Sequence, residues 1–108
     1  MLQDGLQQCE QLQVLYLYGN RISAIQGLNA ASSLTQLYLQ DNNITAIEGL
    51  DACPKLRILH LGNNRISRLE GCGKLRDLEE LHLPNQATES LFEFEEDSLV
   101  TIAVRCLL

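Results

Sequence analysis

The segment LQVLYLYGNRISAI, residues 12–25, recurs along the chain without insertion. The second copy, LTQLYLQDNNITAI, starts at Leu34, and the third, LRILHLGNNRISRL, starts at Leu56. A fourth copy starts at Leu78 as LEELHLPNQ and then departs from the pattern. The interval between successive starts is the same each time. This constant period predicts one structural unit repeated along the chain.

The shared pattern, L-x-x-L-x-L-x-x-N-x-I-x-x-I/L, resembles the leucine-rich repeat. Such a repeat contributes one short strand and one returning arc, and neither can bury its apolar side alone. We therefore expect an α/β fold, a right-handed superhelix (solenoid) with a short parallel β-sheet. The sheet forms the concave face, meaning the side of the strands that points away from the core. Irregular or 3-10 arcs form the convex face.

Period-2 alternation predicts that the leucines of each L-x-L point inward, so that Leu15 and Leu17 stack on Leu37 and Leu39 and onward through the repeats. The arcs add an isoleucine-rich set to this core: Ile22, Ile44, Ile66, Ile25, Ile47 and Leu69. The pattern also predicts an asparagine ladder, because the amide can satisfy backbone groups where the chain leaves each strand. Its members are Asn20, Asn42 and Asn64, and Gln86 stands at the fourth position.

A glycine column and a cysteine set complete the pattern. Gly5, Gly27, Gly49 and Gly71 follow one another at the repeat period, as suits a tight turn with positive φ. Three of the four cysteines fall on inward columns, and no C-x-x-C pair exists. We interpret all four as reduced thiols in a reducing compartment, the three on inward columns acting as small buried hydrophobes. The four cysteines are Cys9, Cys53, Cys72 and Cys106.

Composition narrows the function. The chain of 108 residues carries a net charge of −6, which argues against binding phosphates or an anionic membrane surface. No apolar run is long enough to span a bilayer, and the start MLQDGLQQCEQ is not a signal peptide. GCGK at 71–74 lacks the remaining residues of a phosphate loop, and QDNN at 40–43 lacks those of a calcium loop. We therefore predict no enzyme, no catalytic residue, no cofactor, no metal, no nucleic acid and no membrane contact.

The strand positions between the leucines indicate a binding surface. All three tyrosines and both histidines fall there, with Tyr16, Tyr38, His60 and His82 in one column. Exposed aromatic residues on a rigid sheet are typical of protein interfaces, although tyrosine also has good strand propensity of its own. As a further hypothesis, the histidines would make binding sensitive to pH around their unperturbed pKa of about 6.5. The predicted partner-binding residues are Tyr16, Tyr18, Gln36, Tyr38, Asp41, His60, Glu80 and His82.

The flanks do not repeat cleanly. We assign residues 1–88 to the repeats, with a partial repeat at 1–11 and starts at 12, 34, 56 and 78. Residues 89–108 are an acidic flank followed either by a short helix, capped by Asp97 or Ser98, or by a truncated next repeat. We expect this chain to be an interior piece of a longer repeat protein or a short isoform.

The uninterrupted period with N-x-I-x-x-I, together with VLYLYGN, IEGL and LEELHLPNQ, resembles the leucine-rich regulatory subunits of protein phosphatase 1. The resemblance implies a non-catalytic adaptor in the cytoplasm, at the centrosome or in a cilium. Its partner would be a phosphatase catalytic subunit, tubulin or another cytoskeletal protein. The contacts carried over are Tyr16, Tyr38, His60, Glu80 and His82, although no basic-x-Val/Ile-x-Phe docking string is present. The alternatives are a secreted or cell-surface recognition protein and an axonemal protein similar to dynein light chains.

Overall fold

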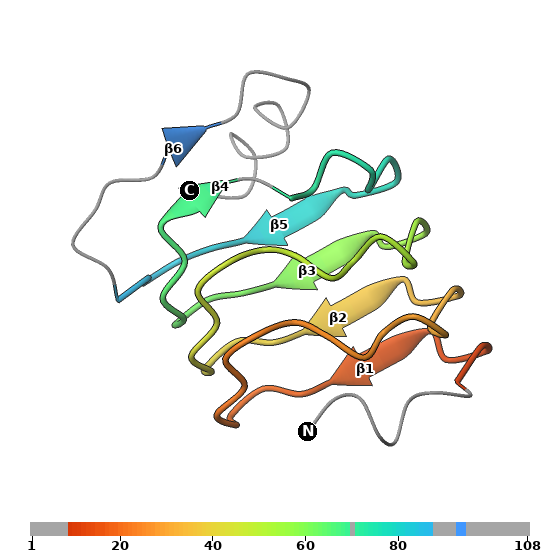
Figure 1. Ribbon diagram of the computed structural model, residues 1–108, viewed down its shortest axis with the longest axis horizontal. Coiled ribbons are helices and arrows are strands. Elements are labelled where there is room, and N and C mark those ends of the chain that lie inside the picture. Colours follow the sequence, from red (N-terminus) through yellow and green to blue (C-terminus); the bar gives the residue numbers. More distant parts are fainter. Residues whose placement is uncertain (1–8, 70, 88–92, 95–108) are drawn as a thin grey trace.

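The computed structural model describes residues 9–69, 71–87 and 93–94. Four short strands lie side by side in one parallel sheet, in the order β1, β2, β3 and β5 (Figure 1). Their bounds are Val14–Tyr16 for β1, Gln36–Tyr38 for β2, Ile58–His60 for β3 and Glu80–His82 for β5. Each of β1, β2 and β3 is followed by an arc that leads to the next strand of this sheet. The predicted solenoid with a parallel sheet is therefore confirmed.

The register of the sheet follows the sequence period. Tyr16 pairs with Tyr38, Tyr38 pairs with His60, and His60 pairs with His82. Backbone bonds extend the ladder beyond the strand ends, as in the 2.8 Å bond from Leu17 N to Tyr38 O. Because every repeat has the same length, each residue lies beside its equivalent in the next repeat.

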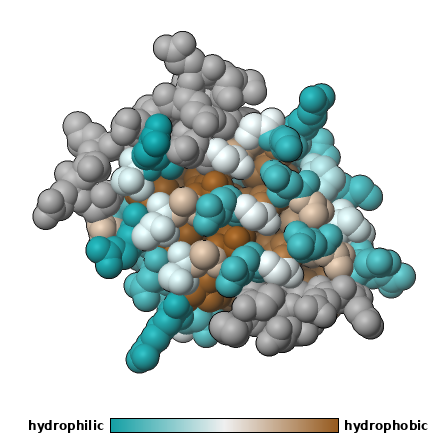
Figure 2. Space-filling model, viewed as in Figure 1, coloured by the Kyte–Doolittle hydropathy of each residue, from teal (hydrophilic) through white to brown (hydrophobic). Residues whose placement is uncertain are grey.

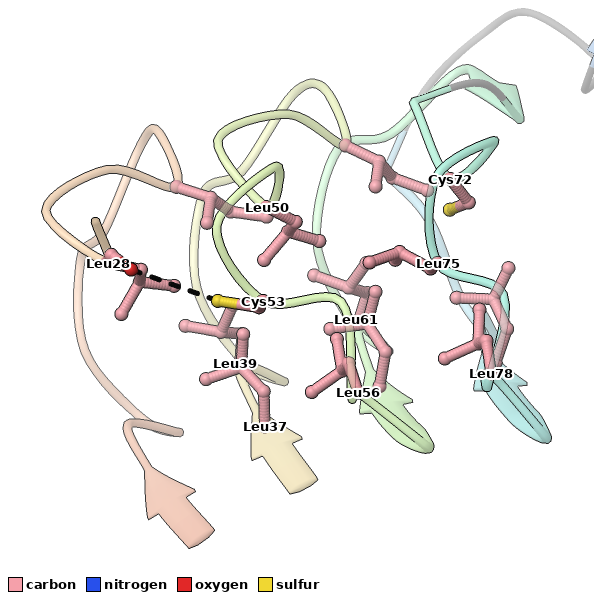
Figure 3. Packing of buried hydrophobic residues seen from close by; sticks show 14 of the residues in the cluster. Leu28, Leu37, Leu39, Leu50, Cys53, Leu56, Leu61, Cys72, Leu75 and Leu78 are labelled. Carbon is pink, nitrogen blue, oxygen red and sulfur yellow. Dashed lines mark hydrogen bonds between the residues drawn. The ribbon is translucent and has the colours of Figure 1, made fainter. Parts of the chain in front are cut away.

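The leucines and isoleucines fill the space between the sheet and the arcs. Leu37, Leu39, Leu59 and Leu61 are fully buried, and Leu81 is nearly so. Figure 3 shows Leu37, Leu39 and Leu61 of this set together with Cys53, whose Sγ lies 3.9 Å from the carbonyl oxygen of Leu28. Figure 2 shows hydrophobic residues between hydrophilic ones over the middle of one face, and hydrophilic side chains projecting at its edge. The predicted alternation of the strands thus accounts for the core.

The first described repeat is less buried than the rest. Leu15, Leu17 and Ile22 are only partly buried against the core, whereas their equivalents in later repeats are enclosed. Cys9, expected in the core, is likewise half-buried, while Cys53 and Cys72 are buried as predicted. A residue in the middle of a stack is covered from both sides, so burial rises from the first repeat inward.

The predicted asparagine ladder is present. The side-chain amide nitrogen of Asn64 donates to the carbonyls of Leu39, Leu61 and Gly62, and its oxygen accepts from the backbone N–H of Ile44. Asn42 makes the equivalent four bonds one repeat earlier, and Asn20 binds two carbonyls. Gln86 continues the ladder, since its Oε1 accepts from Ile66 N at 2.9 Å and its Nε2 donates to Leu61 O at 2.7 Å.

The glycine column has the predicted positive φ. The φ angles are 80° at Gly27, 74° at Gly49 and 84° at Gly71, and Gly5 lies outside the described residues. A Cβ at Gly49 would also collide with the carbonyl oxygen of Ile25 in the preceding repeat. Glycine is therefore required there both by the backbone conformation and by the close approach of two arcs.

A second small sheet lies outside the repeat pattern. Strand β4 (Arg68–Leu69), in the arc of the third repeat, pairs in parallel with β6 (Glu93–Phe94) (Figure 1). Arg68 pairs with Glu93, whereas the repeat period would assign position 90 as its partner. Strand β6 thus pairs with the arc of the third repeat out of step with the repeat period. The predicted helix over 99–108 and the alternative truncated repeat lie outside the described residues.

Candidate partner-binding face

Four ring side chains form a continuous stack on the concave face, here called the aromatic stripe: Tyr16, Tyr38, His60 and His82. The ring centroids of Tyr16 and Tyr38 are 4.8 Å apart with planes 10° from parallel. Tyr38 and His60 follow at 5.3 Å and 25°, and His60 and His82 at 3.9 Å and 2°. The stripe arises because each ring occupies the same position of its repeat, and paired positions of neighbouring parallel strands lie within stacking distance.

The first repeat presents the most exposed aromatic surface. Tyr16 is 63% exposed and Tyr18 is 55% exposed, the largest exposed hydrophobic side chains of the described residues. Their rings meet edge to face, with centroids 6.4 Å apart and planes at 89°. An edge-to-face pair leaves ring surface uncovered, so part of both rings is open to solvent at this end of the sheet.

The histidine end of the stripe is held by a carboxylate. Glu80 Oε1 lies 3.0 Å from His82 Nε2, and both residues belong to β5. Burial lowers the pKa of His60, and the charge of His82 lowers it further, while Glu80 acts in the opposite direction. Because the two imidazoles are stacked, protonating both would place two positive charges in contact. The neutral form of His60 is therefore favoured at neutral pH.

The predicted residues Gln36 and Asp41 support their neighbours. Gln36 Oε1 accepts a 2.8 Å hydrogen bond from the hydroxyl of Tyr38 and so fixes that ring. Asp41 has a φ of 61°, and its Oδ1 accepts a 2.8 Å bond from Asn63 Nδ2. The structure thus brings the eight predicted residues onto one face, where Asn63 orients the carboxylate of Asp41.

An ion pair at the border of the face was not predicted. Arg57 Nε lies 2.7 Å from Glu79 Oε2, and a second contact of 3.2 Å makes the pair bidentate. The hydrogen bond and charge of Glu79 raise the pKa of the Arg57 guanidinium. The signal that would have found the pair is the opposite charge at equivalent positions of consecutive repeats. The arginine therefore stays charged and is paired with a carboxylate beside the concave face.

The described residues hold no group of three or more His, Cys, Asp and Glu side chains that could bind a metal ion. Nor does this part of the chain contain a helix of the length and apolarity needed to cross a bilayer. The chemistry that the concave face offers consists of aromatic stacking, hydrogen bonding and two carboxylates, which are the means of recognising another molecule.

Comparison with known proteins agrees with this architecture. A family model described as leucine-rich repeats (2 copies) matches residues 10–52, 32–71 and 54–94. Among solved structures, the chain is similar to an internalin (inlF) from Listeria monocytogenes str. 4b F2365, with a TM-score of 0.65 and 22% identity. That match covers 92% of this chain and 34% of the internalin chain, and it shows a shared fold alone. No curated protein matches the chain.

Proposed function

Because this chain belongs to the leucine-rich repeat family, we propose that it is a non-catalytic protein–protein interaction module that binds its partner through the concave face. Repeats of this family generally mediate protein–protein interaction. Stacked repeats form an extended, rigid sheet surface, and such surfaces are what solenoid proteins use for recognition.

The observation that carries the proposal is the aromatic stripe. Its rings are already ordered by stacking and by the bonds from Tyr38 to Gln36 and from His82 to Glu80. A side chain that is ordered before binding loses less rotamer entropy when the partner arrives. Aromatic residues are also the most frequent energetic centres of protein interfaces. The concave face is therefore prepared for binding at little entropic cost.

The finer proposal is an adaptor similar to protein phosphatase 1 regulatory subunits or associated with the cytoskeleton, acting in the cytoplasm, at the centrosome or in a cilium. It is supported by a likeness to protein phosphatase 1 regulatory subunit 42 in VLYLYGN (14–20), LTQLYLQDNNI (34–44) and LEELHLPNQ (78–86). These three strings carry Tyr16, Tyr38 and His82 of the stripe. The proposed partners are a phosphatase catalytic subunit and tubulin.

The test measures direct binding of the purified phosphatase 1 catalytic subunit and of tubulin to the immobilised chain. A double variant, Tyr16→Ala with Tyr38→Ala, removes half of the stripe and should weaken the interaction by about tenfold or more. A matched control, Thr45→Ala with Glu48→Ala, changes two exposed positions of an arc and should bind like the parent.

Equal binding by the parent and the stripe variant would show that the concave face is not the contact surface. Failure of both proteins to bind the parent chain would remove the phosphatase and cytoskeletal proposal. Binding of the parent chain to an axonemal dynein heavy chain, or to an extracellular receptor, would favour the corresponding alternative.

A further inference from the structure

Charge is distributed unevenly between the concave face and the rest of the described chain. The strand-and-turn segments 14–20, 36–42, 58–64 and 80–86 form that face and contain two carboxylates, Asp41 and Glu80. They contain none of the seven lysines and arginines of the described residues. Those seven are Arg21, Lys55, Arg57, Arg65, Arg68, Lys74 and Arg76.

Three arginines are direct sequence neighbours of these segments, since Arg21 and Arg65 follow the ladder asparagines Asn20 and Asn64 and Arg57 comes before β3. Arg57 immediately precedes β3, and its guanidinium is held by both oxygens of Glu79. Of the two histidines, His60 is kept neutral by burial and by the neighbouring imidazole, which lower its pKa. The carboxylates that a partner meets on the concave face are those of Asp41 and Glu80.

The two carboxylates lie on either side of the aromatic stripe. Glu80 stands at the start of β5, two residues before His82, and Asp41 stands in the turn after β2, three residues beyond Tyr38. Each makes one hydrogen bond or ion contact, Asp41 with Asn63 and Glu80 with His82. A carboxylate has room for about four hydrogen bonds, so both are oriented and retain acceptor capacity.

The exposed rings at the start of the stripe favour the same kind of ligand. Tyr16 and Tyr18 present uncovered ring surface, and the face of a tyrosine ring attracts ammonium and guanidinium groups. Guanidinium groups also form bidentate bonds with carboxylates. An acidic partner segment would instead meet two like charges and no lysine or arginine on this face.

Resting on the proposed binding role of the concave face, we propose that its partner is a basic protein segment, with lysine or arginine side chains placed over Tyr16 and Tyr18 and against Asp41 and Glu80. The overall charge of −6 assists the encounter by long-range attraction. The aromatic rings supply most of the contact area, and the carboxylates select a partner segment of positive charge.

The test is a selection from a phage-displayed library of random peptides of about 12 residues, long enough to cross the sheet in extended form. We expect the enriched peptides to carry an excess of lysine and arginine. One enriched peptide is then synthesised with a fluorescent label, and its affinity is measured by anisotropy for the parent and for each variant.

Two variants probe the two parts of the surface. Asp41→Asn with Glu80→Gln removes both charges and keeps shape, and Asn63 and Asn85 already occupy the left-handed backbone position equivalent to Asp41. Tyr16→Ala with Tyr18→Ala removes the exposed rings. Each should weaken peptide binding by about tenfold. A charge-matched control, Glu48→Gln with Asp51→Asn, alters exposed arc carboxylates and should change the affinity by less than about twofold.

Three results would overturn the inference. The enriched peptides could lack an excess of lysine and arginine and still bind the tyrosine variant more weakly than the parent. This result would refute the basic partner and leave the proposed binding face intact. Basic peptides that bind the tyrosine and carboxylate variants as tightly as the parent would refute both. The absence of enriched peptides would show that a linear basic segment does not suffice for recognition.

Discussion

Replacing Asn64 with alanine tests the physical basis of the solenoid most directly. Asn64 is 1% exposed and makes four hydrogen bonds to the backbone of its own and the preceding repeat. Asn20 occupies the same repeat position but is exposed and bonds only two carbonyls. The comparison of Asn64→Ala with Asn20→Ala therefore separates the effect of burial from the effect of residue type.

The loss in free energy of unfolding depends on which backbone groups the Asn64→Ala substitution leaves without a hydrogen bond. The carbonyls of Leu39, Leu61 and Gly62 each keep another donor, from Asn42, Gln86 and Asp41 respectively. The backbone N–H of Ile44 loses the one bond that the structure gives it. One orphaned buried donor costs about 1–3 kcal/mol, and the void adds about 1 kcal/mol, so we expect Asn64→Ala to cost about 3 kcal/mol. For Asn20→Ala we expect less than about 1 kcal/mol, because Leu17 O keeps Asn42 and water reaches the rest.

The assay is urea unfolding of the parent and both variants, with the free energy of unfolding taken by linear extrapolation. A stabilising osmolyte is added to all samples so that the weaker variant still folds. Asn64→Asp is a third chain, which keeps the acceptor for Ile44 N–H but replaces the donor nitrogen with a buried charge. It should be destabilised at least as much as Asn64→Ala. Equal costs for Asn64→Ala and Asn20→Ala would refute the reasoning, because burial of the ladder would then contribute nothing.

Three further outcomes are expected. Gly49→Ala should destabilise the chain by about 2 kcal/mol or more, because Gly49 has a positive φ and its Cβ would meet the carbonyl oxygen of Ile25. Gly73 has open space around it, so Gly73→Ala should change the free energy of unfolding by less than about 0.5 kcal/mol. Both variants are measured by urea unfolding. In an NMR titration, His60 should titrate below about 6.5, and the free energy of unfolding should fall as the pH drops from about 6.5 through this lowered folded-state pKa. A flat stability profile over that range, equal to that of His60→Gln, would contradict this. Burial raises the pKa of the Cys53 thiol, so this thiol should resist alkylation until urea unfolds the chain. Alkylation is followed by mass spectrometry, and rapid labelling of Cys53 in the native protein would contradict its burial.

Much of the candidate face was predictable because the repeat length is constant. A parallel sheet with one strand per repeat must place Tyr16 beside Tyr38 and His60 beside His82, whatever the exact curvature. The inward leucines and the asparagine ladder follow from the same argument. The continuation of that ladder by Gln86 was less evident, because a longer side chain reaches the same groups only if the backbone is placed to suit it.

Other features were outside the reach of the pattern. The pairing of Arg68 with Glu93 departs from the period, and no periodic argument applies once the spacing changes. The support of Tyr38 by Gln36, and of His82 by Glu80, depends on rotamers. A residue two positions away on the same strand face can reach its neighbour, but the sequence does not say that it does.

The sequence by itself determined the architecture, the register and the identity of the residues on the concave face, because a constant repeat period converts chain position into spatial position. Only the tertiary structure decided how those residues interact. The planes of the stacked rings, the lowered pKa of His60 and the ion pair of Arg57 with Glu79 depend on distances of a few ångströms. Such distances are set by packing between repeats, which no single segment of the chain encodes.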